Sequence, residues 1–81
     1  MKISILLFGI LREHLQVSVL EWQVSQEYYT VEALLTELKN TYPLIGMLRS
    51  VAVAVNGEYA PPDYCLRPQD EIALIPPVSG G

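Results

Sequence analysis

The stretch of sequence that decides the fold is Lys2-Ile3-Ser4-Ile5-Leu6-Leu7-Phe8, which alternates polar and apolar residues at its start and is wholly apolar at its end. This pattern is typical of a β-strand that is buried on one face and partly buried on the other. It predicts a strand near the centre of a sheet. Gly9 interrupts the pattern, and residues 10–15 form either a turn of helix or a loop.

A second strand is expected at residues 18–24, where apolar and polar side chains alternate again. One face would carry Leu20, Trp22 and Val24, and the other Val19, Glu21 and Gln23. The two strands follow each other directly, so we expect them to pair as an antiparallel hairpin with a long connection.

A helix is expected to begin after Thr30, whose side chain suits the N-cap position, with Ala33 at N3. Glu32 lies in the first turn, where the helix dipole favours a negative charge. Apolar residues then recur at helical spacing: Val31, Leu34, Leu35, Leu38 and Tyr42. We expect the helix to run through Thr41 and Pro43 to stop it, with a linker that includes Gly46 and Arg49 after it.

The second half of the chain contains two further strands. Residues 51–55 are rich in valine and end at Asn56-Gly57, a type I′ hairpin signal. Pro61-Pro62-Asp63 excludes regular structure, and residues 67–70 look like a turn before a last strand at residues 71–75. The short segment after the hairpin is either a strand or a turn.

The order strand, strand, helix, strand, strand predicts an α+β fold of the β-grasp, or ubiquitin-like, type. A mixed sheet of four to five strands would pack on one main helix, because a right-handed crossover returns the chain to the same sheet. The first and last strands would lie side by side and parallel at its centre. We expect the domain to occupy residues 1–75 and an extended tail to occupy residues 76–81.

Composition and charge exclude several classes of protein and of binding partner. The chain has 81 residues, enough for one domain, and with 51% apolar and 17% charged residues it is too apolar to be disordered. The single cysteine excludes an internal disulfide framework, and no apolar stretch reaches 18 residues, so we expect a soluble cytoplasmic protein. The net charge of −4 has the wrong sign for binding nucleic acid or anionic membranes.

The side chains that could carry chemistry do not form a set. His14 is the only histidine and has no second ligand for a metal, and Cys65 has no basic neighbour in sequence, so we assign it to packing. Asp70 and Glu71 are adjacent at a strand start and would point to opposite faces. We therefore predict no metal site, no permanently bound cofactor and no catalytic side chains.

The end of the sequence, Pro76-Pro77-Val78-Ser79-Gly80-Gly81, is the remaining candidate. Consecutive prolines favour an extended polyproline segment of ~3.1 Å per residue, so five residues would carry a terminal carboxylate roughly 15 Å from the sheet. Glycines lack a Cβ and can enter a narrow channel. The carboxylate of Gly81 would be ionised at neutral pH and could attack the α-phosphate of ATP in a partner's site. The alternative is an unanchored tail without a function.

The sequence resembles the MoaD/ThiS family of ubiquitin-like sulfur carriers over essentially its whole length. The resemblance rests on Leu7-Phe8 followed by Arg12-Glu13, on Thr30-Val31-Glu32-Ala33-Leu34, on Val55-Asn56, on Asp70-Glu71-Ile72-Ala73 and on the tail. The Pro-Pro-Val-Ser lead into the two glycines favours the molybdenum cofactor branch. The chain departs from the usual pattern at Ile75, where an aromatic residue is common, and at Gly9, where alanine is common.

This resemblance implies a mechanism. A ubiquitin-activating-like adenylyltransferase would use ATP to form a glycyl adenylate at Gly81, and a sulfur donor would convert it to a thiocarboxylate (thioglycine). The tail would then enter the large, catalytic subunit of molybdopterin synthase and donate sulfur to cyclic pyranopterin monophosphate. Two small and two large subunits would assemble.

Partner contacts are expected from the tail residues Pro76, Pro77, Val78, Ser79 and Gly80, and from Phe8 and Leu74 on the sheet face opposite the helix. Three alternatives stay open: a carrier for thiamine or a tungsten cofactor, a ubiquitin-like protein modifier, and a simple β-grasp binding module. The sequence assigns no contacts to Arg12 or Arg49.

Overall fold

Strand β1 (Lys2–Leu7) buries every second side chain: Ile3, Ile5 and Leu7 are each at most 2% exposed. It pairs antiparallel with β2 (Val19–Gln23), with Ile3 opposite Trp22 and Ile5 opposite Leu20. Trp22 and Leu20 are partly buried, so the predicted hairpin and its faces are confirmed.

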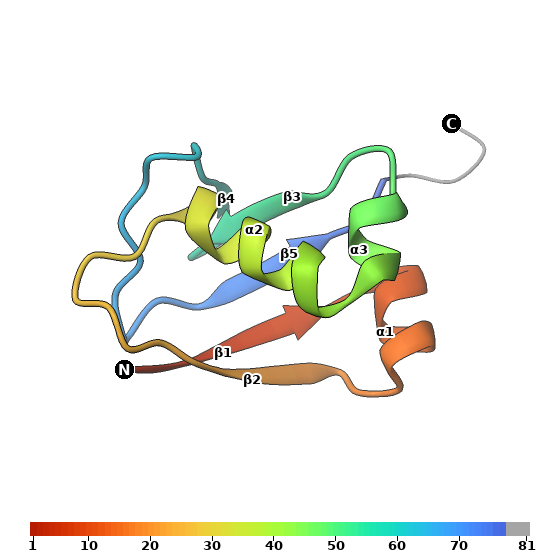
Figure 1. Cartoon of the computed structure of the whole chain (residues 1–81), viewed down its shortest axis with the longest axis horizontal. Coiled ribbons are helices and arrows are strands. Elements are labelled where there is room, and N and C mark those ends of the chain that lie inside the picture. Colours follow the sequence, from red (N-terminus) through yellow and green to blue (C-terminus); the bar gives the residue numbers. More distant parts are fainter. Residues whose placement is uncertain (78–81) are drawn as a thin grey trace.

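The other strands complete a five-stranded mixed sheet in the order β2-β1-β5-β3-β4. They are β3 (Ala52–Val55), β4 (Glu58–Tyr59) and β5 (Ile72–Ile75). β5 pairs parallel with β1 and antiparallel with β3, so the first and last strands lie side by side at the centre, as expected. The fold is the predicted β-grasp, drawn in Figure 1, and the computed structural model describes residues 1–77 of it.

Helix α2 (Val31–Thr41) covers one face of the sheet. The Ala33 N–H donates a hydrogen bond of 3.1 Å to Thr30 Oγ1, which confirms the predicted N-cap. The helix buries Val31, Leu34 and Leu38 against the core. Because this stripe and alternate residues of β1 and β5 belong to one buried core cluster, the sheet has one covered face and one open face.

Two segments form short helices: for one of them the sequence left helix and loop open, and for the other it predicted a linker. Residues 10–15, for which helix and loop were both open, belong to α1 (Gly9–Leu15). The linker expected after Pro43 is instead a helix, α3 (Pro43–Met47); that prediction was wrong because proline at the first helical position begins a helix as readily as it ends the previous one. Leu11 and Ile45, both 0% exposed, close the core at this end.

The opposite end of the sheet is held by turns. Asn56 and Gly57 have φ angles of 54° and 87°, as a type I′ hairpin requires, and join β3 to β4. In the following loop, Asp70 accepts hydrogen bonds from Asn56 Nδ2, the Tyr64 hydroxyl and the Arg67 N–H at 2.9–3.1 Å. The loop without regular strands is thus tied to the hairpin by polar contacts. Within residues 1–77, no helix has the length and apolar character needed to cross a membrane.

Candidate functional site

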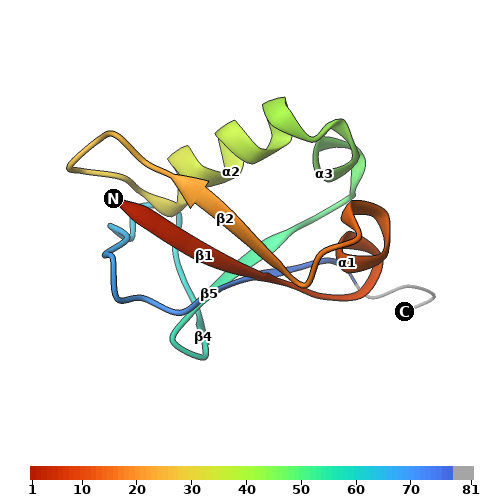
Figure 2. The same ribbon diagram turned by 90° about the horizontal axis from the view of Figure 1, so that it is seen from below.

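The tail leaves the domain from the end of the central strand β5. Pro76 and Pro77 follow Ile75 directly and are half-buried, so the first residues of the tail are held against the domain. Figures 1 and 2 show this exit beside α1 and beside the connection from α3 to β3. Val78, Ser79, Gly80 and Gly81 lie outside the described residues, so the roles predicted for them stay predictions.

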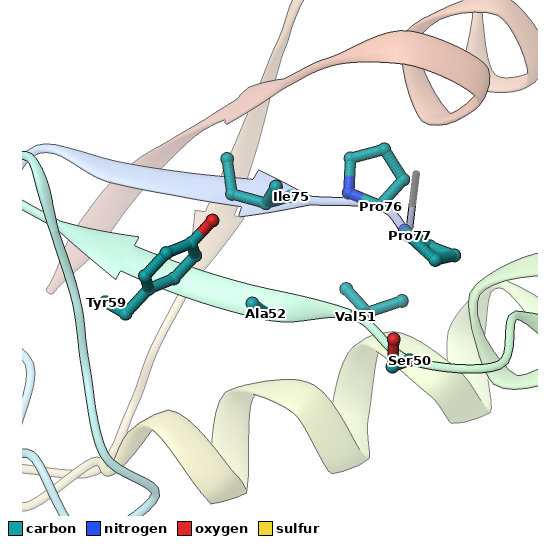
Figure 3. A pocket seen from close by; sticks show the side chains of 7 residues that line it. All are labelled: Ser50, Val51, Ala52, Tyr59, Ile75, Pro76 and Pro77. Carbon is teal, nitrogen blue, oxygen red and sulfur yellow. The ribbon is translucent and has the colours of Figure 1, made fainter. Parts of the chain in front are cut away.

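A groove of about 530 Å³ runs along the sheet at the start of the tail, as Figure 3 shows. Its walls come from the chain before and within β3, from β4, and from the end of β5 and the two prolines. The lining residues are Ser50, Val51, Ala52, Tyr59, Ile75, Pro76 and Pro77. All but Ser50 and the hydroxyl of Tyr59 are apolar, so the groove suits apolar side chains better than a charged small molecule.

The open face of the sheet carries an apolar row that crosses all five strands beside this groove. The strand register aligns Val19 with Leu6, Leu6 with Ala73, Ala73 with Ala54 and Ala54 with Tyr59. Val19 is 39% exposed and Tyr59 75% exposed. Such a continuous apolar row on one exposed face is typical of a surface that another protein covers.

The residues nearer the tail extend this row. Phe8, which follows β1, is 44% exposed, and Ile75 is partly exposed opposite Ala52. We call this surface the apolar half-face and define it by the row and these residues: Leu6, Phe8, Val19, Ala52, Ala54, Tyr59, Ala73 and Ile75. Phe8 is therefore exposed directly after β1, and the partner contact predicted for it stays a prediction.

The remaining part of the open face is polar. Lys2, Ser4, Glu21 and Gln23 are exposed there, and the Ser4 hydroxyl lies 3.0 and 3.1 Å from the two carboxylate oxygens of Glu21. Because polar groups that already bond one another gain little from an apolar partner, the polar residues mark where the apolar half-face ends.

Leu74 does not lie on the open face, so its predicted position was wrong. It is 0% exposed and aligns with Leu7 and Val53, which are also buried under α2. Side chains alternate along a strand, and Ile72 at the start of β5 already faces the core, so Leu74 must do the same. Ala73 and Ile75 take the open positions.

The contributions of β3 and β4 to this surface were not predicted from the sequence. Ala52, Ala54 and Tyr59 join it only through the pairing of β3 with β5 and β4. The alternation of alanine and valine in residues 51–55 was a signal that one face of β3 carries small side chains.

His14 and Cys65, for which the sequence predicts no catalytic role, lie apart from the apolar half-face. His14 is exposed on α1, and Cys65 is half-buried in a bridge that pairs it with Thr30. No group of three or more His, Cys, Asp or Glu side chains within the described part of the chain could hold a metal. Asp70 is occupied by the loop hydrogen bonds described above.

One buried polar group has a shifted pKa. Burial raises the pKa of Tyr29 to about 12. The hydrogen bond from Trp22 opposes this shift, and the nearby Glu37 carboxylate adds to it with smaller effects. The Trp22 indole N–H donates to the Tyr29 hydroxyl at 3.2 Å. Tyr29 lies in the core and anchors the loop before α2, so its raised pKa is a consequence of core packing.

Comparisons with known proteins agree with this geometry. The model of the ThiS family matches residues 5–81. A molybdopterin synthase sulfur carrier subunit of Arabidopsis thaliana is 36% identical over 81 residues, covering 99% of this chain and 83% of that protein. One of Mycobacterium tuberculosis is also 36% identical over 81 residues, covering 99% and 98%.

Solved structures are also similar to this chain. The crystal structure of SAMP1 from Haloferax volcanii superposes with a TM-score of 0.80 at 28% identity and covers all of both chains. The match thus extends over the whole sheet and both ends of the domain. With its β-grasp fold and this full-length similarity, the chain belongs to the MoaD/ThiS family.

Proposed function

We propose that the chain is the sulfur carrier subunit of a molybdopterin synthase. The single observation that carries the proposal is the delivery of the tail from the central strand, directly beside the exposed apolar half-face. The relatives named as such carriers support it, because they match along 99% of this chain. A carrier needs no catalytic side chains, and the chemistry then lies in the terminal carboxylate.

In this function the Gly81 carboxylate attacks the α-phosphate of ATP in a ubiquitin-activating-like adenylyltransferase. Pyrophosphate leaves and a glycyl adenylate forms; a sulfur donor then displaces AMP to give a thiocarboxylate. The thiocarboxylate sulfur attacks a carbon of cyclic pyranopterin monophosphate in the large subunit, and water then cleaves the acyl–sulfur bond, which leaves the sulfur on the pterin and returns the Gly81 carboxylate. ATP and free thiols are available in the cytoplasm, where we place the protein.

In this proposal the chain delivers the Gly81 carboxylate to the partner's active site. Pro76 and Pro77 restrict the backbone where it leaves the sheet, and they pack against the domain. The sequence of the residues after Pro77 lets us expect an extended segment of ~3.1 Å per residue, which would carry Gly81 roughly 12 Å beyond Pro77. Gly80 and Gly81 have no side chains to obstruct a narrow channel. The reacting atom is thus presented far from the bulk of the domain.

The large subunit covers the apolar half-face in this proposal. Phe8 and Ile75 border the start of the tail, so one partner can bury the apolar row and receive the tail together. The channel of the large subunit receives the tail residues Pro76, Pro77, Val78, Ser79 and Gly80. Two carriers bind two large subunits in the assembly. Desolvating exposed apolar surface contributes ~25 cal/mol per Å², which supplies affinity without a specific charge pair.

A second candidate function is a ubiquitin-like protein modifier. It is favoured by the likeness to the small archaeal modifier protein 1 of Haloferax volcanii, which has the same fold over its full length. A modifier uses the same activation but ends in an isopeptide with a lysine. A carrier for thiamine or a tungsten cofactor would differ only in the acceptor of the sulfur.

The test is the intact mass of the protein after incubation with its host's activating enzyme, ATP and a sulfur source. The expected result is a mass gain equal to replacement of one oxygen by sulfur, absent from a Gly81 deletion that folds normally. An unmodified mass, with the same enzyme active on another carrier, would contradict the proposal. A covalent conjugate to lysine would favour the modifier.

A further inference from the structure

Pro76 lies between two other segments of the sheet at the point where the tail begins. The parallel register of β1 with β5, continued past both strands, places it opposite Gly9. The antiparallel register of β3 with β5, continued in the same way, places it opposite Val51. Figure 3 shows Pro76 between Val51 and the ribbon of β1 and α1. The tail is thus flanked on two sides from its first residue.

Packing holds Pro76 and Pro77 against the domain, since proline has no backbone N–H to donate to a neighbouring strand. The last residue of β5 is Ile75, so the regular ladder ends directly before the two prolines. Proline also fixes φ, so the path of the chain here follows from where the two rings rest. The shape of the neighbouring surface therefore sets the direction in which the tail starts.

Gly9 forms one side of this surface and leaves room for the Pro76 ring because it has no side chain. A Cβ built on Gly9 would lie 3.3 Å from the Pro76 Cγ, closer than the 3.4–4 Å of an ordinary van der Waals contact. One of the two residues would have to move by a few tenths of an ångström to admit that atom.

Pro76 is the residue that would move. Gly9 lies between two buried side chains, since Leu7 is 2% and Leu11 0% exposed, and the Leu11 N–H donates a hydrogen bond of 3.2 Å to Phe8 O. Moving Gly9 would disturb both leucines in a closely packed core, whereas Pro76 is half-buried at the edge of the domain. Because the proline ring contains the backbone nitrogen, a shift of the ring redirects the chain.

We propose that Gly9 is a positioning residue for the reaction at the tail. Its bare backbone seats the Pro76 ring and so fixes the direction in which the tail leaves the sheet, relative to the apolar half-face. This inference rests on the proposed function and adds a residue outside the tail that governs delivery of the Gly81 carboxylate. Gly9 touches no substrate and acts through Pro76.

This role separates binding from reaction. Gly9 is not part of the apolar half-face, so a side chain at this position leaves the residues of the partner contact unchanged. Reacting groups, however, must be held within about 0.5 Å and 10–20° of their productive geometry. A redirected tail should therefore slow the reaction inside the complex and leave formation of the complex nearly unchanged.

The test compares Gly9→Asn with Gly57→Asn in the full-length chain. Both glycines have positive φ angles, +55° and +87°, which asparagine tolerates better than most side chains. A Cβ on Gly57 would meet nothing within 4 Å, so of these two substitutions Gly9→Asn is the one that crowds the tail. ATP–pyrophosphate exchange catalysed by the host's activating enzyme gives kcat and KM. Thermal unfolding identifies the temperatures at which every variant is folded.

Pro76→Ala supplies the rescue, because it removes the Cγ that the new side chain would meet. Gly9→Asn, Pro76→Ala and the double variant together form a double-mutant cycle for kcat. Where Gly9→Asn is unfolded at the assay temperature, Gly9→Ala replaces it, since its Cβ alone approaches the Pro76 Cγ.

We expect Gly9→Asn to lower kcat about tenfold with KM within about twofold of the wild type, because misplacing a reacting group costs rate. Gly57→Asn should keep kcat within about twofold of the wild type, as a distant and independent site. Pro76→Ala should lower kcat about threefold by relaxing the backbone, and adding Gly9→Asn to it should lower kcat no further.

A merely structural role of Gly9 predicts a different pattern. Partial unfolding lowers the concentration of active carrier, which raises the apparent KM and leaves kcat at saturation unchanged. The split between kcat and KM therefore distinguishes a redirected tail from a less stable domain.

Three results would overturn the inference: a folded Gly9→Asn variant with the wild-type kcat, a Gly57→Asn variant that loses as much, or a double variant whose loss equals the product of the two single losses. A wild-type chain that undergoes no exchange would overturn the proposed function itself, and this inference with it. The wild-type reaction thus separates the two failures.

Discussion

Gly9 leaves no room for a side chain beside Pro76: a Cβ built on Gly9 would lie 3.3 Å from the Pro76 Cγ. Gly9 has a φ of +55°, in the left-handed region that L side chains rarely adopt. The junction between β1 and α1 therefore supports the first proline of the tail, and the absence of a side chain at Gly9 permits this approach.

Gly9→Ala should lower the free energy of unfolding by about 1–2 kcal/mol, because alanine in the left-handed region is strained and its Cβ crowds Pro76. Urea unfolding measures the loss. Gly46→Ala is the matched control: its Cβ would make an ordinary contact at 3.7 Å inside a helix, so it should raise stability by about 0.5–1 kcal/mol.

Replacing Pro76 by alanine in the Gly9→Ala background separates the two causes. The double variant lacks Cγ and should regain the part of the loss that comes from the contact but not the part that comes from φ. Equal effects of Gly9→Ala and Gly46→Ala would contradict the proposed strain.

Asn56→Ala should destabilise the hairpin by about 1–3 kcal/mol, through loss of hydrogen bonds and strain at a φ of 54°. Its side chain donates to Asp70 at 3.0 Å and accepts from the Glu71 N–H at 2.9 Å. Asn56→Gly loses the same bonds but tolerates the φ, so the difference between the two variants in urea unfolding gives the strain. An Asn56→Gly variant as stable as the wild type would show that the bonds contribute nothing.

Tyr29→Phe should flatten the loss of stability at alkaline pH. The folded protein has a Tyr29 pKa of about 12, above the ordinary value of 10.0, so the neutral form is favoured by folding. Its stabilising effect is complete below pH 10 and is lost as the pH rises towards 12. Urea unfolding between these pH values measures the slope.

The control for this titration is Tyr28→Phe, at a side chain that is 70% exposed, which should keep the wild-type alkaline slope. At neutral pH, Tyr29→Phe should cost about 1 kcal/mol, because the Trp22 indole N–H loses its acceptor. An unchanged slope in Tyr29→Phe would contradict the burial of that hydroxyl.

Ala54→Asp, in the middle of the apolar half-face, should weaken binding of the large subunit at least tenfold, because a carboxylate would be buried without a partner. Titration calorimetry with the purified large subunit measures the affinity. Ser4→Asp makes the same charge change on the polar part of the open face and should leave affinity nearly unchanged. Equal losses in both variants would contradict the proposed boundary of the interface.

Several features of the protein followed from the sequence alone because their causes are local. The N-cap at Thr30 depends on one side chain and the N–H three residues later, and the turn at Asn56-Gly57 depends on two residues that tolerate positive φ. The alternation in β1 and the stripe of α2 showed which faces are buried. The order of these elements then gave the β-grasp topology, and the residues of the tail gave the family.

Tertiary structure decided what depends on register and on the packing of distant segments. Leu74 and Ile75 are adjacent and equally apolar, and only the pairing of β5 with β1 and β3 turns one to the core and the other to the open face. Pro43 begins a helix because this helix buries Ile45 in the core. The apolar row and the close approach of Gly9 to Pro76 bring together residues that are far apart in the chain. Local sequence preferences act over a few residues, so such arrangements emerge only when the sheet is assembled.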